Sequence, residues 1–182
     1  MSSPKHKVRD LIGCNPSSVR PAVYLAGKIR QTCWRHLLID GLRNHSWNDG
    51  PLTQVDFDYL GPFFVGCDHG CYHRDSSHGA GIGCTPDFDI HAWCVAQYCR
   101  DAVEACDLVF AFIESRDCHG TIAELERAHT KKIPVVIAFA PGLATPIAND
   151  FWFVCTLARS VIYDVDESQL PALLRRSIKE WT

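Results

Sequence analysis

Glu124 is the residue of this chain whose type and position most clearly suggest chemistry. It follows residues 107–113, where five consecutive apolar residues (108–112) are typical of a strand buried on both faces. Gly120 and Thr121 then open a predicted helix whose first turn carries Glu124. A carboxylate at this point could act as a base or a nucleophile. It could equally cap the helix, because Thr121 and Glu124 have the S/T-x-x-E spacing of a capping box.

Predicted strands and helices alternate along the rest of the chain. The strands are expected at 21–29, 55–65, 107–113, 133–139 and 160–165, and the helices at 32–42, 89–105, 121–130, 151–158 and 167–181. This alternation implies right-handed crossovers and a parallel sheet covered on both faces. We therefore expect an α/β fold of the flavodoxin-like (Rossmann-like) type, with a five-stranded parallel sheet in the order 2-1-3-4-5 and helices on both faces.

In that strand order, the carboxyl ends of the first and third strands open onto a shared crevice, where ligands bind in such folds. The crevice would bring together residues from two strand ends: Tyr24, Gly27, Lys28 and Arg30 from the first, and Asp117, Gly120, Thr121 and Glu124 from the third. This convergence favours chemistry over capping for Glu124. Lys28 and Arg30 either face the crevice or are solvated beyond the strand end, and the sequence leaves both open.

Composition limits the class of protein and of partner. With 182 residues, 47% hydrophobic and 21% charged, we expect a single domain over residues 21–182 after a flexible lead-in at 1–20. A net charge of −3 without long runs argues against a nucleic acid polymer as partner. The N-terminus lacks a secretory signal, and no apolar run approaches the ~20 residues of a membrane span, so we expect a soluble cytoplasmic protein. Most of the ten cysteines lie in apolar segments and are expected to be reduced.

The segment 66–84 is rich in cysteine, histidine and glycine. Its alternating thiols and imidazoles are ligands that zinc prefers, but their spacing fits neither a zinc ribbon nor a finger, so we expect no metal site. We expect this loop to fold over the crevice, with Asp68, His69 and Tyr72 touching substrate. An ordered surface loop without a role is the alternative.

Three segments resemble the nucleoside 2-deoxyribosyltransferase family, which also includes nucleotide N-hydrolases. They are VYLAG at 23–27, the strand and helix entry at 107–128, and IPVVIAFA at 133–140, and the resemblance covers most of residues 21–150. It implies that Glu124 attacks the anomeric carbon of a sugar and that Tyr24 positions this acid. Asn149 looks similar to a family asparagine that reaches into the neighbouring subunit's site, which implies a homo-oligomer, a dimer or larger.

The chain departs from the family pattern at two acids. Asp117 lies seven residues before Glu124, where the family acid lies six before, so its role as a third catalytic residue is in doubt. A second family acid lies on the preceding helix, at the position that Cys99 occupies here. Asp101 is two residues further on and is expected to be a solvated helix residue.

The resemblance implies an enzyme that cleaves the N-glycosidic bond of a nucleoside and transfers the sugar to another base. Such chemistry requires no metal or organic cofactor. The N–H groups at Gly120 and Thr121 could hold a 5′-hydroxyl or 5′-phosphate, and Lys28 and Arg30 would favour the phosphate. The alternatives are a nucleoside 5′-monophosphate N-hydrolase and a nucleotide-sensing module without turnover.

Overall fold

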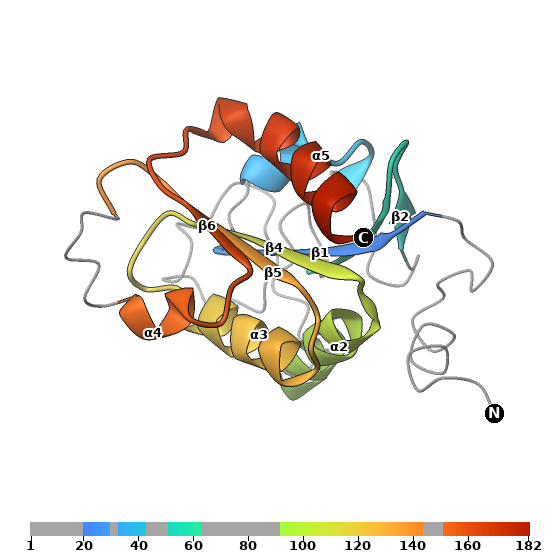
Figure 1. The fold of residues 1–182 in the computed structure, drawn as a ribbon. Coiled ribbons are helices and arrows are strands. Elements are labelled where there is room, and N and C mark those ends of the chain that lie inside the picture. Colours follow the sequence, from blue (N-terminus) through green and yellow to red (C-terminus); the bar gives the residue numbers. More distant parts are fainter. Residues whose placement is uncertain (1–19, 30–32, 43–50, 63–91, 144–150) are drawn as a thin grey trace, which may run out of the picture.

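The computed structural model describes residues 20–29, 33–42, 51–62, 92–143 and 151–182. They form an α/β structure around one mostly parallel sheet (Figure 1). The strands, in chain order, are β1 (Ala22–Gly27), β2 (Leu52–Thr53), β3 (Asp58–Gly61), β4 (Leu108–Ile113), β5 (Val135–Phe139) and β6 (Ser160–Ile162). Their order across the sheet is β2-β3-β1-β4-β5-β6.

The prediction of five parallel strands is wrong at one edge of the sheet. β2 adds a sixth strand, which pairs antiparallel with β3 through Leu52 with Tyr59 and Thr53 with Asp58. Two residues are too short to show the period-2 pattern that marks a strand in sequence, so β2 is defined by its neighbour in space. The five mutually parallel strands lie in the order β3-β1-β4-β5-β6.

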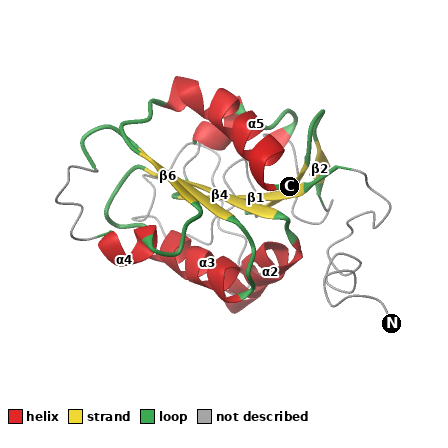
Figure 2. Cartoon of the chain, viewed as in Figure 1, coloured by secondary structure: helices red, strands yellow, loops and turns green. Residues whose placement is uncertain are grey.

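Helices cover both faces of this sheet (Figures 1 and 2). One face carries α2 (Ala92–Ala105), α3 (His119–Thr130) and α4 (Trp152–Cys155). The other face carries the 3₁₀ turn η1 (Trp34–Leu37) and α5 (Leu170–Trp181), which follows the turn η5 (Glu167–Gln169). The helices expected at 32–42 and 151–158 are shorter than predicted, and part of each apolar pattern faces solvent: Leu37 is 60% and Phe153 54% exposed.

The hydrophobic core consists of one layer on each face of the sheet. Every residue of β1, β4 and β5 is buried, as the continuous apolar runs predict. Alternate residues of β1 serve the two layers: Tyr24 packs into the layer that contains Leu125 of α3, and Leu25 into the layer that contains Trp34 and Leu174. None of the helices in the described ranges is both long and apolar enough to cross a membrane.

The sheet has its topological switch point at β1. Its two neighbours are β3 and β4, so the chain leaves β1 first to one side and then to the other. β1 and β4 pair in register from Val23 with Leu108 to Gly27 with Phe112. Their carboxyl ends therefore lie at the same edge, where α/β folds bind ligands.

Candidate active site

The central contact of the site joins β1 to α3. The Tyr24 hydroxyl donates a hydrogen bond of 2.6 Å to Oε1 of Glu124, across 100 positions of sequence. Tyr24 is fully buried, and Glu124 is partly exposed. The parallel pairing of β1 with β4, and the short turn from β4 into α3, place these two side chains together. The structure thus brings together the tyrosine and the acid that the sequence singled out.

The capping hypothesis for Glu124 is wrong. The helix begins at His119, with Cys118 as the N-cap residue and no side-chain hydrogen bond to the cap. Thr121 is therefore the third helical residue and Glu124 lies in the second turn, beyond the free N–H groups of the first. The prediction was wrong because an S/T-x-x-E spacing does not determine at which residue the helix begins. Glu124 instead accepts its hydrogen bond from another element of the fold.

Burial changes the acidity of Glu124. Desolvation raises the pKa of its carboxyl group to about 7, and the hydrogen bond from Tyr24 and the positive charge of Arg35 limit that rise. At neutral pH this carboxyl group can therefore exist in both forms. A carboxylate poised in this way can act as a nucleophile or a base without a metal.

Cys99 of α2 belongs to the same cluster. Its thiol is hydrogen-bonded to Tyr24, and burial, followed by the nearby Glu124 charge, raises its pKa to about 12. The thiol therefore stays protonated and can donate to the Tyr24 oxygen, while Tyr24 donates to Glu124. Asp101, two residues further along, accepts from Gln97 on the same exposed helix surface, in agreement with its expected solvated role.

Lys28 and Asp117 form an ion pair across the carboxyl edge. The Asp117 side chain is 63% and that of Lys28 29% exposed, so the pair lies at the mouth of the site. The hydrogen bond from Lys28 lowers the pKa of Asp117 to about 2, so this carboxylate remains ionised. The structure places Lys28 at the carboxyl edge of the sheet but gives it a carboxylate partner, which a phosphate would have to displace.

Backbone atoms complete the edge around Gly27. A Cβ at Gly27 would lie 2.8 Å from the Phe112 carbonyl oxygen and 3.3 Å from Nη2 of Arg35, and the backbone φ is +154°. Only glycine fits this position. Gly120 is exposed, with open space where a Cβ would be, whereas Thr121 is buried.

Arg35 and Cys33 are site neighbours that sequence patterns did not reveal. Arg35 is fully buried, and its Nη1 lies 3.5 Å from the sulfur of Cys33, which is 2% exposed. Burial alone would raise the pKa of the Cys33 thiol, but the Arg35 charge and the hydrogen bond with His36 lower it to about 6. The one available signal was a charged residue within an apolar stretch, between Trp34 and Leu37.

Several predicted site residues lie outside the described residues: Arg30, Asp68, His69, Tyr72 and Asn149. The cysteine- and histidine-rich segment 66–84 does too. Within the ranges that the structure does describe, no group of three or more metal-binding side chains is found. The prediction that no zinc is bound therefore stays a prediction.

The raised pKa of Glu124 predicts a pH-dependent difference in stability between the wild-type protein and Glu124→Gln. A carboxyl group whose pKa is higher in the folded than in the unfolded state stabilises the fold below its unfolded pKa, and this stabilisation is lost as pH rises through the folded value. The melting temperature of the wild-type protein should therefore fall relative to that of Glu124→Gln between about pH 5 and pH 8. Thermal unfolding of both proteins across this range measures the effect, and a constant difference would contradict it.

Comparisons with known proteins add similarity to solved structures. No family model matches this chain, and no curated protein does. Among solved structures, it is similar to a conserved protein from Enterococcus faecalis V583, with a TM-score of 0.48 and 16% sequence identity. The match covers 87% of this chain and 99% of that one. The interpretation of the site therefore rests on the molecule's own geometry.

Proposed function

We propose that this protein cleaves the N-glycosidic bond of a nucleoside or nucleotide, with Glu124 as the nucleophile, and transfers the sugar to another base. The observation that carries this proposal is the 2.6 Å contact between Tyr24 and Glu124 at the switch point of a flavodoxin-like sheet. It joins the two residues whose counterparts form the reaction centre in the nucleoside 2-deoxyribosyltransferase family that the sequence resembles.

The proposed reaction has two halves. A Glu124 oxygen attacks the anomeric carbon through an oxocarbenium-like transition state, and the bond to the base breaks with its electron pair leaving on the base nitrogen. A proton from water or the site neutralises the departing base. The incoming base then attacks the same carbon, forms the new C–N bond, loses its N–H proton to water and releases the Glu124 carboxylate. With water as the acceptor the reaction becomes hydrolysis.

Tyr24 supports this chemistry by holding the nucleophile. Its hydroxyl is bonded to one Glu124 oxygen, which fixes the carboxylate orientation before substrate arrives. Burial raises the pKa of Tyr24 well above its usual value, so the hydroxyl keeps its proton and continues to donate. Cys99 extends the chain of hydrogen bonds behind Tyr24.

The position of Lys28 favours a 5′-monophosphate as a second candidate substrate. In this proposal the phosphate takes the place of the Asp117 carboxylate beside the Lys28 ammonium. We expect Lys28→Ala to lower kcat/KM for a nucleoside 5′-monophosphate at least about tenfold more than for the matching nucleoside, because a charge-assisted contact is lost. Steady-state kinetics with both substrates measure this ratio.

The control for this prediction is Lys179→Ala, which removes an exposed cation from α5. It should leave the ratio unchanged. If Lys28→Ala weakens both substrates equally, Lys28 supports the site only through Asp117. If it changes neither, the phosphate lies elsewhere.

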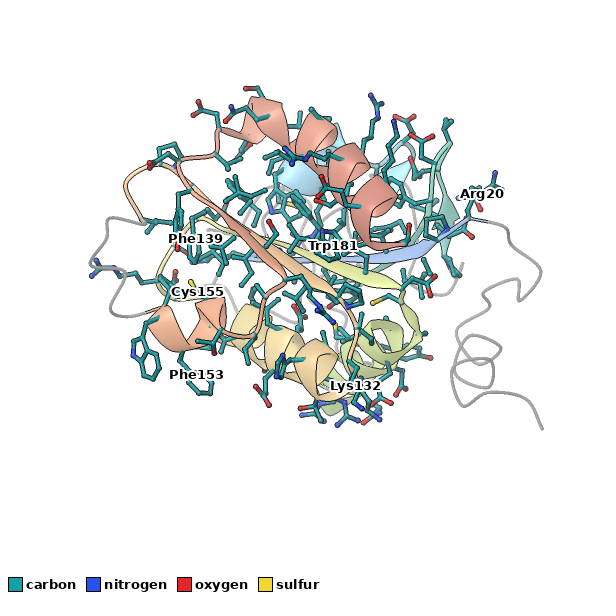
Figure 3. The ribbon with its side chains drawn as sticks, viewed as in Figure 1. Arg20, Lys132, Phe139, Phe153, Cys155 and Trp181 are labelled. Atoms are coloured by element: carbon teal, nitrogen blue, oxygen red, sulfur yellow. The ribbon has the colours of Figure 1, made fainter. Side chains whose placement is uncertain are left out.

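An exposed aromatic pair supports a homo-oligomer. Trp152 and Phe153 of α4 are 65% and 54% exposed, and their rings meet edge to face at 5.7 Å. Phe153 projects outward from α4 (Figure 3). Apolar surface of this kind is typical of protein interfaces, and it follows closely after Asn149, which the family resemblance places at a subunit boundary. We propose a cytoplasmic homo-oligomer with this helix at its interface.

One incubation separates the proposed function from its alternatives. The purified protein is given individual deoxynucleosides and their 5′-monophosphates, with and without a second free base, and products are resolved by chromatography. Transfer predicts an exchanged base that depends on the added acceptor. Free base and free sugar alone would indicate a hydrolase, and tight binding without any product would indicate a sensing module.

A further inference from the structure

Arg35 is the one charged residue that is fully buried in the described part of the chain, and the proposed reaction gives it no role. Its side chain is fully buried, and it belongs to η1, on the face of the sheet opposite α3. Nε donates to the Leu25 carbonyl at 2.8 Å, and Nη2 donates to the Gly27 carbonyl at 2.7 Å. Nη1 donates to the Lys28 carbonyl at 3.2 Å. One guanidinium thus holds three carbonyl groups at the carboxyl end of β1.

Arg35 and the Leu25, Gly27 and Lys28 carbonyl groups are called the Arg35 clamp below, and the neighbouring residues allow it to form. Because Gly27 has no Cβ, Nη2 of Arg35 can approach the strand end closely. Trp34 supports the guanidinium from one side, with the Arg35 Cζ atom 4.7 Å from the ring centroid. Trp34 itself packs against Phe112 of β4, with ring centroids 5.7 Å apart. These contacts therefore link the carboxyl ends of β1 and β4.

We propose that Arg35 is a positioning residue of the site: it fixes the carboxyl half of β1 and thereby holds Tyr24, on the same strand, against Glu124. This inference rests on the proposed function for its catalytic consequence. Three backbone acceptors require a planar group with several fixed donors, which arginine provides and lysine does not. Arg35 contacts no substrate in this proposal and acts through the strand and through Glu124.

Among the described groups around Glu124, Arg35 is the main source of positive charge. Tyr24 from β1 is hydrogen-bonded to the acid, Cys99 from α2 is hydrogen-bonded to Tyr24, and both are protonated at neutral pH. Tyr59 from β3 is buried and also protonated. The ion pair of Glu104 with Arg127 joins α2 to the second half of α3. Arg35 is the cation whose charge lowers the pKa of Glu124, against the larger effect of burial.

Cys33 supplies the negative charge that stabilises the buried Arg35 guanidinium. No ion pair among the described residues joins Arg35 to a carboxylate, and the Cys33 sulfur at 3.5 Å is the anionic group within its reach. A buried cation without such a partner would carry a large desolvation cost.

A double-mutant cycle tests this inference without substrate. Thermal unfolding is measured from about pH 5 to pH 9 for the wild-type protein, Glu124→Gln, Arg35→Met and the double variant. The stability difference that Glu124→Gln causes, with and without Arg35→Met, is plotted against pH, and each curve gives the midpoint of the Glu124 titration. We expect Arg35→Met to raise this midpoint by about one pH unit, because removal of a nearby cation disfavours the carboxylate. Arg176→Met, which changes an exposed arginine paired with Glu180, should leave the midpoint in place.

Two further variants keep the inference falsifiable. If Arg35→Met does not fold, Arg35→Gln replaces it in the cycle, because its amide can still donate to a strand carbonyl. Arg35→Lys keeps the charge but not the planar fork, so the midpoint should stay while kcat falls at least about tenfold. A midpoint that does not move without the guanidinium, or an Arg35→Lys protein with unchanged kcat, overturns the inference. The proposed function fails separately, when the wild-type protein itself releases no base.

Discussion

Glu124→Gln is expected to fold and to bind substrate, while base release falls by several orders of magnitude. The amide oxygen can still accept the hydrogen bond from Tyr24, so the contact that joins β1 to α3 is kept. The amide cannot form the covalent glycosyl intermediate, because it is a far weaker nucleophile than a carboxylate. Rates of base release for both proteins at saturating substrate, together with their melting temperatures, measure this expectation.

Glu126→Gln is the matched control for this prediction. Glu126 lies on the same helix, is exposed, and accepts a hydrogen bond from Thr130. Its substitution should leave base release within about twofold of wild type. Should Glu124→Gln retain activity within about tenfold of wild type, the loss would be only about 1.4 kcal/mol of transition-state energy, which is too small for a covalent nucleophile.

Gly27→Ala is expected to produce the largest loss of stability among single substitutions at the site. The new Cβ would lie 2.8 Å from the Phe112 carbonyl oxygen, at a backbone φ of +154°. Overpacking costs about 1–3 kcal/mol, and an unfavourable backbone conformation costs about 1–3 kcal/mol more. For a domain of this size, we expect the melting temperature to fall by about 5–15 °C. The new Cβ should also displace the Arg35 guanidinium from the end of β1.

Gly120→Ala provides the comparison. Gly120 lies inside α3, where a Cβ would meet nothing within 4 Å. Alanine is favoured over glycine in a helix by up to about 1 kcal/mol, so this variant should melt at or above the wild-type temperature. Equal melting temperatures for the two variants, measured by calorimetry or circular dichroism, would mean that the strand end can rearrange around a side chain at Gly27.

The sequence predicted the elements whose pattern is long and continuous. The apolar runs of β1, β4 and β5 are buried as expected, and their alternation with helices predicted the α/β class. β2 escaped prediction, because it has only two residues. The capping box predicted at Thr121 and Glu124 does not form, because the helix already begins at His119 and both residues lie inside it.

The site was predictable only where residues belong to patterned elements. Tyr24 lies on the first predicted strand and Glu124 on the helix that follows the third, so the predicted strand order brought their elements together. Arg35 and Cys33 were missed, because their importance depends on three-dimensional contacts: a guanidinium acquires its role from the Leu25 and Gly27 carbonyls that it reaches. The ion pair of Lys28 with Asp117 likewise depends on how two loops meet across the edge.

The most direct test of the central claim is mass spectrometry of the protein after reaction with a 2-deoxy-2-fluoro nucleoside. The fluorine slows the breakdown of a glycosyl-enzyme, so a covalent intermediate accumulates. We predict that the peptide containing Glu124 gains the mass of one fluorinated sugar, that the free base is released in equal amount, and that Glu124→Gln gains none. A sugar attached to a different residue, or base release from the wild-type protein with Glu124 unmodified, would contradict the account.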